Sequence, residues 1–247
     1  MEMWRPFRKA TEIGRPKLPS GSRVYAIGDV HGRADLLQDT FVKIDRHRDA
    51  YPVTNAVEIL LGDYIDRGPS SFDVIELLLT RVRNGTICLK GNHEAFLLEF
   101  LKDPTVLNVW QRCGGLETLA SYGLEPSLDL SRQDQEDLAA SLADRMPAHH
   151  HDFLNSLPLC LTLGDYFFVH AGVRPGTALS NQLPADLLWI REDFLRHEGS
   201  FGKVVVHGHT PVDEPEIRNN RINLDTGAFA TGNLTCAVFE EDQILFL

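Results

Sequence analysis

Side chains of the types that bind metal ions follow the ends of several apolar, strand-like segments. In chain order these side chains are Asp29, His31, Asp63, Asn92, His93, His170, His207 and His209. Carboxylate oxygens and imidazole nitrogens together suit a divalent transition metal such as manganese, iron or zinc, whereas calcium prefers oxygen ligands alone. Singly, each residue has an ordinary interpretation as a helix cap, a turn or a surface histidine. Their joint placement beside glycines is more specific and predicts a metal site.

Three similar segments position the first of these residues. Apolar runs at 24–27, 57–61 and 86–89 each lead into a Gly-Asp or Gly-Asn pair, and apolar residues at helical spacing follow each run. Strands that alternate with helices predict an α/β fold with crossover connections. In such a sheet the loops at the carboxyl ends of the strands converge on one crevice.

The second half of the chain has a different pattern. The stretch from about 103 to 158 has helical patches and an acidic segment, which predict a helical insertion over the sheet; its function does not follow from its sequence. Short strands separated by short loops come afterwards and favour antiparallel pairing. They are expected at 166–169, 204–206, 222–224, 234–239 and 244–247.

Five short blocks resemble the phosphoprotein phosphatase family of calcineurin-like metallophosphoesterases, in its bacterial and phage form. They are GDVHG at 28–32, GDYIDRG at 62–68, GNHE at 91–94, VHAG at 169–172 and GHT at 208–210. The resemblance runs from about residue 23 to the end and leaves most of the insertion uncovered. It implies the calcineurin-like fold, with central mixed β-sheets flanked by helices.

The resemblance also implies a dinuclear metal centre with one bridging carboxylate. Its ligands would be Asp29, His31 and Asp63 for the first ion and Asp63, Asn92, His170 and His209 for the second. Manganese is the expected metal, with iron or zinc as alternatives. A water between two such ions loses a proton near neutral pH and attacks phosphorus in line, so no covalent phosphoenzyme is required.

The same blocks imply the remaining catalytic groups. His93 would protonate the leaving oxygen, and Asp66 would hold its other ring nitrogen; the alternative for Asp66 is a carboxylate that caps the following helix. Arg67 would bind phosphoryl oxygens through its planar guanidinium group. Arg191 is the candidate for a second phosphate-binding arginine, with a surface ion pair as its alternative, and Arg174 is a weaker candidate.

Two further histidine features have less specific interpretations. His207 lies two residues before His209, and only His209 matches the ligand block, so we expect His207 in the core or behind a ligand. The tract His149-His150-His151 has the composition of a metal site at the cleft mouth. The sequence shows no further ligand residues that would support that role. The favoured interpretation of the tract is the solvated start of a helix.

Composition limits the alternatives. The chain has 247 residues, 43% of them hydrophobic, with a net charge of −11. These values predict a single domain over 23–247 after a flexible basic arm at 1–22. The acidic balance argues against nucleic acid as a partner, and the longest apolar runs are too short to span a membrane. Four scattered cysteines favour a reducing compartment, so a cytoplasmic location is expected.

Three functions are compatible with these residues. The first is a metal-dependent serine/threonine protein phosphatase acting on a phosphorylated protein or peptide, which the intact Asp66-Arg67 pair and Glu94 favour. The alternative is a hydrolase of dinucleoside polyphosphates, such as diadenosine tetraphosphate, or of another small phosphoester. The third is a non-catalytic scaffold that binds phosphorylated partners, which predicts a missing ligand or acid, and none is missing. The sequence leaves the oligomeric state open.

Overall fold

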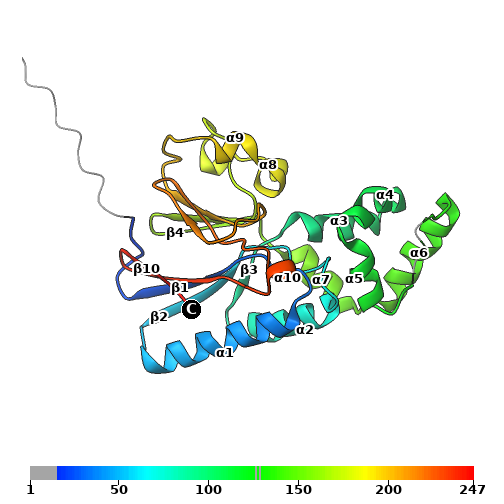
Figure 1. Ribbon diagram of the computed structural model, residues 1–247, viewed down its shortest axis with the longest axis horizontal. Helices are drawn as coiled ribbons and strands as arrows, with labels where there is room; N and C mark the ends of the chain where they lie inside the picture. Colours follow the sequence, from blue (N-terminus) through cyan, green and yellow to red (C-terminus); the bar gives the residue numbers. More distant parts are fainter. Residues whose placement is uncertain (1–15, 126, 128) are drawn as a thin grey trace, which may run out of the picture.

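Two five-stranded β-sheets pack face to face in the computed structural model, which describes residues 16–125, 127 and 129–247 (Figure 1). The first sheet has the order β10-β9-β1-β2-β3, with bounds Gln243–Phe246, Cys236–Glu240, Ser22–Ile27, Asn55–Leu60 and Ile87–Cys88. The second has the order β4-β5-β6-β8-β7, with bounds Cys160–Leu163, Tyr166–Val169, Val204–His207, Arg221–Asn223 and Glu216–Ile217.

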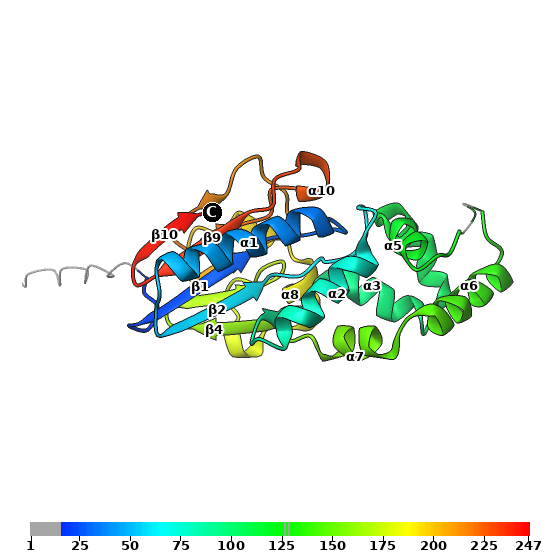
Figure 2. The ribbon, with the colours of Figure 1, turned by 90° about the horizontal axis from the view of Figure 1, so that it is seen from below.

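Helices cover the outer faces of both sheets and form a separate group at one end (Figures 1 and 2). Their bounds are Ala34–Ala50 for α1, Ser71–Val82 for α2, Asn92–Phe100 for α3, Leu107–Trp110 for α4, Gly115–Ser121 for α5, Arg132–Arg145 for α6, Ala148–Ser156 for α7, Pro184–Trp189 for α8, Glu192–Leu195 for α9 and Ala228–Thr231 for α10. The predicted α/β fold with mixed sheets is confirmed.

Apolar side chains on both faces of the strands create three cores. In β1, Val24 and Ala26 belong to the core between the sheets, whereas Tyr25 and Ile27 belong to the core under α1 and α2. This alternation follows from the pleat, which turns successive side chains to opposite faces. A third, smaller core fixes α8 and α9 on the second sheet through residues such as Phe194. Strands buried on both faces need continuous apolar sequences, as the apolar runs show.

The strand pairing confirms one expectation and corrects another. β1 is parallel to β2 and β2 to β3, as the crossover helices predict. Antiparallel pairing among the later strands is found for β9 with β10 and for β7 with β8. It is wrong for β6, which is parallel to both β5 and β8. The segment between β5 and β6 carries α8 and α9 and is long enough for a parallel crossover.

The predicted helical insertion consists, among the described residues, of α4 to α7 with two short 3-10 segments, at Pro104–Val106 and Gln111–Cys113. It extends beyond the end of the sheets (Figure 2). The acidic segment in its sequence includes a helix start, because Ser131 and Asp134 form a reciprocal capping box at α6. No helix in the part of the chain that the structure describes is both long and apolar enough to cross a bilayer.

The described part of the predicted basic arm packs on the sheets. Leu18 is buried, and its backbone N–H donates to the carbonyl of Glu241 over 3.0 Å. The backbone N–H of Lys17 donates to the Asp165 carboxylate over 2.9 Å. The expectation of a flexible arm is therefore wrong for residues 16–22, because burial of an apolar side chain holds this segment. Residues 1–15 of that expectation lie outside the described residues.

Candidate metal centre

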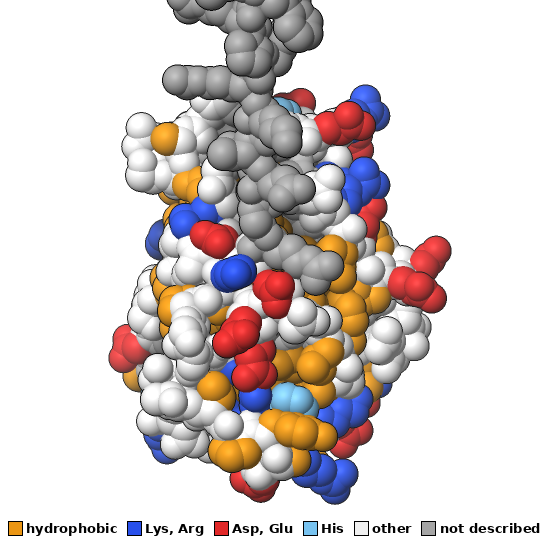
Figure 3. Space-filling model, turned by 90° about the vertical axis from the view of Figure 1, so that its left-hand side faces the viewer, with side chains coloured by type: hydrophobic (Ala, Val, Ile, Leu, Met, Phe, Trp, Pro, Cys, Tyr) orange, Lys and Arg blue, Asp and Glu red, His pale blue; other side chains and the backbone are white. Residues whose placement is uncertain are grey.

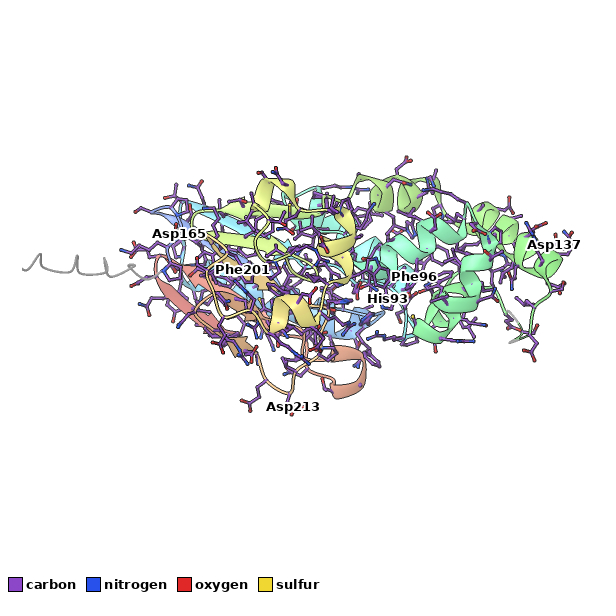
Figure 4. All side chains as sticks on the ribbon, turned by 90° about the horizontal axis from the view of Figure 1, so that it is seen from above. His93, Phe96, Asp137, Asp165, Phe201 and Asp213 are labelled. Atoms are coloured by element: carbon purple, nitrogen blue, oxygen red, sulfur yellow. The ribbon has the colours of Figure 1, made fainter. Side chains whose placement is uncertain are left out.

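The predicted ligands converge at the carboxyl ends of the strands of both sheets. All six are at most 5% exposed: Asp29, His31, Asp63, Asn92, His170 and His209. Figure 4 shows where this region lies, because the labelled His93 and Phe96 are placed between the sheets and the helical insertion. The loops after β1, β2, β3, β5 and β6 carry these ligands and His93, as the rule for α/β sheets predicts.

Left-handed backbone conformations concentrate at this centre. Among the described residues, six non-glycine residues have a positive φ. Five of them are predicted site residues, namely His31, Asp63, Asp66, Arg67 and His209, with φ of 46°, 54°, 72°, 67° and 66°. Such conformations cost about 1–3 kcal/mol each and persist where the surrounding structure enforces them. Their clustering indicates that orienting these side chains costs the fold some stability.

The first group of predicted ligands includes His31 and Asp63, with His93 close by. The Nε2 atom of His31 lies 3.6 Å from Oδ2 of Asp63, and its Nδ1 donates to the carbonyl of Ile65 over 2.8 Å. That hydrogen bond leaves Nε2 as the unprotonated atom, which is the arrangement of a metal-binding histidine. Burial lowers the pKa of His31 to about 3, so its imidazole is neutral.

The second group combines His170, Asn92 and His209 with the same aspartate. Nε2 of His170 lies 2.8 Å from Oδ1 of Asn92, 3.2 Å from Nδ1 of His209 and 3.3 Å from Oδ1 of Asp63. Nδ1 of His170 donates to the carbonyl of Leu61 over 3.0 Å, which again fixes the tautomer. Burial, followed by repulsion from His170, lowers the pKa of His209 to about 2.

Asp63 lies between the two groups and faces each with a different oxygen. Oδ2 points to His31 and Oδ1 to His170. Burial alone would raise the pKa of Asp63, but the imidazoles of His170 and His93 outweigh it and hold the pKa well below its usual range. Asp63 thus directs one oxygen to each group, which fits the role of bridging ligand predicted for it.

Two buried polar atoms at this centre have no hydrogen-bond partner in the described structure. They are Oδ1 of Asp29 and Nε2 of His209. Burial, followed by repulsion from Asp225 and Asp63, raises the pKa of Asp29 well above its usual range. Unpaired buried groups and crowded carboxylates are costly unless a cation balances them. This donor set, with its mixed oxygens and nitrogens, fits divalent transition metals.

His93 and Asp66 form a tight pair beside the ligands. Nδ1 of His93 lies 2.5 Å from Oδ2 of Asp66, and its Nε2 lies 3.7 Å from Oδ2 of Asp63. Burial would lower the pKa of His93, but the carboxylates of Asp63 and Asp66 raise it overall. These carboxylates therefore favour the protonated form of the imidazole, and its Nε2 lies on the side of the centre. The capping alternative for Asp66 has no support, because its carboxylate bonds side chains instead.

Sequence reasoning did not identify the groups that hold Asp66. The indole N–H of Trp110 donates to Oδ2 over 2.7 Å, and the hydroxyl of Thr118 donates to Oδ1 over 2.5 Å. Both residues come from the helical insertion, so this segment supports the site. No motif marks either residue, and a buried tryptophan that needs a partner for its N–H is a weak signal.

For two further carboxylates the sequence predicted no structural role. Glu94 is buried and accepts hydrogen bonds from the backbone N–H groups of Asp63, Tyr64 and Gly91 over 2.8–3.0 Å, which joins the second and third loops. Asp225 follows β8, accepts from the N–H of Gly227 over 2.9 Å, and raises the pKa of Asp29. Asp225 also follows a strand, so the rule that loops after strands converge on one crevice could have identified it.

The arginines differ in their position. A guanidinium nitrogen of Arg67 lies 3.4 Å from Nε2 of His93, and the group lies 4.9 Å from the centre of the Phe229 ring. Arg191 is exposed and donates to the hydroxyl of Thr210, next to a ligand, over 3.4 Å. Arg174 instead binds the Asp186 carboxylate through two nitrogens, as close as 2.6 Å. Arg67 and Arg191 therefore border the centre, and Arg174 is engaged elsewhere.

His207 occupies the core, as expected. It is fully buried edge-on against Phe194, and its Nδ1 donates to the carbonyl of Gly208 over 3.0 Å. Burial lowers its pKa to about 3. In the histidine tract, His149 and His150 both contact Glu76, whereas His151 contacts Asn155.

Comparisons with known proteins find relatives that match most of the chain. The bis(5'-nucleosyl)-tetraphosphatase PrpE [asymmetrical] of Bacillus mycoides (strain KBAB4) is 30% identical over 232 residues, which cover 85% of this chain and 87% of the relative. The protein of the same name from Bacillus subtilis (strain 168) is 30% identical over 236 residues, covering 87% and 90%.

Solved structures share the fold. The crystal structure of a proposed diadenosine tetraphosphatase matches with a TM-score of 0.64 and 21% identity. The match covers 92% of this chain and 93% of that protein's chain. The cold-active protein-tyrosine phosphatase of a psychrophilic Shewanella species matches with a TM-score of 0.57 and 16% identity, covering 93% and 80%. The calcineurin-like phosphoesterase profile matches residues 22–246, and the chain therefore belongs to that family of metallophosphoesterases.

Proposed function

We propose that this metallophosphoesterase hydrolyses dinucleoside polyphosphates, with diadenosine tetraphosphate as the representative substrate. The observation that carries the proposal is the similarity to relatives named bis(5'-nucleosyl)-tetraphosphatase, which extends over 85% of the chain. The serine/threonine protein phosphatase favoured by the sequence becomes the second candidate. It rests on two short blocks, whereas the tetraphosphatase similarity is nearly full-length.

The geometry explains why those two blocks are weak evidence for a protein substrate. Asp66 orients His93, and Glu94 binds backbone N–H groups of two loops. Neither carboxylate faces outward to meet the rest of a substrate, since both are fully buried. Their roles are equally useful for a phosphate ester and for a phosphate anhydride, so their presence does not select between the two.

Two exposed aromatic side chains border the centre and support a nucleotide substrate. Trp189, at the end of α8, is 41% exposed and lies 6.3 Å from His209 between ring centres. Phe229, on α10, is 37% exposed and lies 5.6 Å from His31. Because the two rings contact histidines of different ligand groups, a polyphosphate across the centre would have an aromatic surface near either end. Nucleobases stack on such surfaces.

The residues of the centre suit hydrolysis of a phosphoanhydride bond. Asp29, His31, Asp63, Asn92, His170 and His209 are proposed to hold the two divalent ions. When bound, such ions supply Lewis acidity and lower the pKa of a water molecule. Arg67 and Arg191 are proposed to bind phosphoryl oxygens and so fix the phosphorus in place.

His93 is proposed to donate a proton to the leaving oxygen. Its Nδ1 proton is held by Asp66, so Nε2 is the atom that delivers the proton to the departing group. One phosphorus–oxygen bond forms from water and one bridging phosphorus–oxygen bond breaks. The same arrangement would serve a phosphoserine, whose alkoxide depends on this proton more strongly.

The finer assignments are also proposals. We infer manganese as the working metal, with iron or zinc as alternatives. The donor set suits all three, so the availability of each metal in the cell determines which one binds. The domain is proposed to extend over 23–247 with the insertion at about 103–158. A cytoplasmic location is proposed on the cysteine content, and neither nucleic acid nor membrane is proposed as a partner.

A single assay with competing substrates tests the function. The manganese-loaded protein is given diadenosine tetraphosphate, phosphoserine, phosphothreonine and phosphotyrosine peptides, and p-nitrophenyl phosphate. We expect the highest kcat/KM for the dinucleotide, with ATP and AMP as the unequal products of asymmetrical cleavage. A higher kcat/KM for a phosphopeptide would establish the second candidate instead, and no turnover of any substrate would favour the scaffold.

A further inference from the structure

A second group of imidazole and carboxylate side chains lies away from the metal centre, where α7 of the insertion packs against α2 (Figures 1 and 2). It consists of Glu76 on α2 with His149 and His150 on α7. One carboxylate oxygen, Oε1 of Glu76, lies 3.0 Å from Nε2 of His149 and 2.7 Å from Nε2 of His150. One ligand atom from each residue lies within 4.8 Å of the other two.

His150 is built into this position as a metal-binding histidine would be. Its side chain is fully buried, and its Nδ1 lies 2.8 Å from the hydroxyl of Tyr122. The ring of Phe72 lies 4.7 Å away between centres and closes the apolar side. A hydrogen bond to one nitrogen, which orients the other nitrogen toward its ligand, is typical of metal sites.

The distances from the Glu76 oxygen to the two imidazole nitrogens are close to those of a tetrahedral site. Zinc–nitrogen bonds of about 2.0–2.1 Å place tetrahedral ligands about 3.3 Å apart. The two nitrogen–oxygen distances of 3.0 and 2.7 Å are therefore a few tenths of an ångström shorter. His149 and Glu76 are 56% and 46% exposed, so both can move outward by that amount. A fourth position facing solvent would remain for water.

We propose that Glu76, His149 and His150 bind a zinc-type divalent ion that links α2 to α7, separate from the dinuclear centre. Two nitrogens and one carboxylate favour zinc, cobalt or nickel over magnesium or calcium, which prefer oxygen ligands. The ion would join a helix of the main domain to the last helix of the insertion. This site is independent of the proposed substrate and would exist whichever phosphoester the protein cleaves.

Zinc stoichiometry tests the site. Zn²⁺ bound per chain is measured by equilibrium dialysis for the wild-type protein and for Glu76→Gln, His149→Ala and His151→Ala. The third variant is the matched control, because His151 is the exposed neighbour on the same helix and contacts Asn155 instead. We expect Glu76→Gln and His149→Ala to bind one Zn²⁺ fewer than the wild type and than His151→Ala. Equal stoichiometry in all four proteins would overturn the proposal.

Two further measurements keep the result specific. Hydrolysis of p-nitrophenyl phosphate by the manganese-loaded variants is expected to match the wild type, since the changed residues lie outside the proposed catalytic machinery. If a variant loses both this activity and the bound zinc, the proposal that the site is separate from the dinuclear centre is overturned. Tyr122→Phe removes the hydroxyl that orients His150 and is expected to weaken Zn²⁺ binding about tenfold or more. Unchanged affinity in that variant would overturn the role of His150 as a ligand.

Discussion

Asp66 illustrates how much of the site depends on hydrogen bonds to one side chain. Its carboxylate is fully buried and bonds His93, Trp110 and Thr118 over 2.5–2.7 Å. A buried carboxylate without partners would take up a proton or unfold its surroundings. With these partners Asp66 holds one rotamer and one tautomer of His93. His93, the proposed acid, is thus oriented by a residue that side chains of the insertion hold in place.

Replacing His93, the proposed acid, tests this arrangement. His93→Asn is expected to lower kcat by about 10² to 10⁴ for a phosphoserine peptide, because an alkoxide is a poor leaving group without a proton. The loss for p-nitrophenyl phosphate should be smaller, since that leaving group needs less protonation. Both rates are measured by steady-state kinetics alongside metal content, which should stay at the wild-type value. Equal losses for the two substrates would contradict the role of His93 as a proton donor.

The limits of sequence reasoning are also visible at individual residues. Asp29, His31 and Asp63 could be found because each directly follows an apolar strand, and strand ends converge by a general rule. Trp110 and Thr118 could not, because their contacts with Asp66 span 44 and 52 residues. Those contacts depend on how the insertion packs, which local spacing does not encode.

At the scale of elements, the short helices α8 and α10 differ from the long ones in what they contribute. α1 and α2 bury one face on the first sheet, which requires regular apolar spacing and made them predictable. α8 and α10 instead present Trp189 and Phe229 beside the centre while exposing part of each ring. A single exposed aromatic residue has no periodic signature, so the sequence offered no reason to select either.

These two aromatic residues provide a prediction at the same scale. Trp189→Leu and Phe229→Leu are each expected to lower kcat/KM for diadenosine tetraphosphate about tenfold, since stacking of a base contributes about 1–3 kcal/mol. The kcat/KM for inorganic tripolyphosphate, which has no base, should fall less. Phe246→Leu is the matched control, because that ring is 43% exposed on the edge strand β10. An equal fall in kcat/KM for the two substrates would show that these rings do not stack on a nucleobase.

At the scale of the whole molecule, the centre joins the two sheets. Asp29 and Asp63 follow strands of the first sheet, and His170 and His209 follow strands of the second. The net charge of −11 does not oppose an anionic substrate here, because bound cations dominate at short range and distant charges are screened beyond about 8–10 Å. On the end of the molecule shown in Figure 3, acidic and basic side chains are interspersed and form no single basic surface.

Metal removal should therefore affect stability as well as activity. Ligands at about 100 times their Kd stabilise a fold by about 2.7 kcal/mol, which for a chain of this length corresponds to about 5–10 °C in Tm. We expect chelation to abolish hydrolysis of p-nitrophenyl phosphate and to lower Tm by about this amount, and added Mn²⁺ to restore both. Calorimetry of the stripped and reloaded protein makes the measurement. An unchanged Tm would show that the crowded carboxylates do not need the cations.

The position of β1 has a consequence for the biosynthesis of the protein. β1 is central in its sheet, yet one of its neighbours, β9, begins only at Cys236. Until that segment has left the ribosome, β1 presents an unpaired edge, which is open to pairing with other chains. The ligand loops are spread almost as widely, from Asp29 to His209. A nascent chain therefore cannot assemble the full set of predicted ligands before His209 has emerged, and ribosome stalling before that point would release an aggregation-prone fragment that lacks part of the centre.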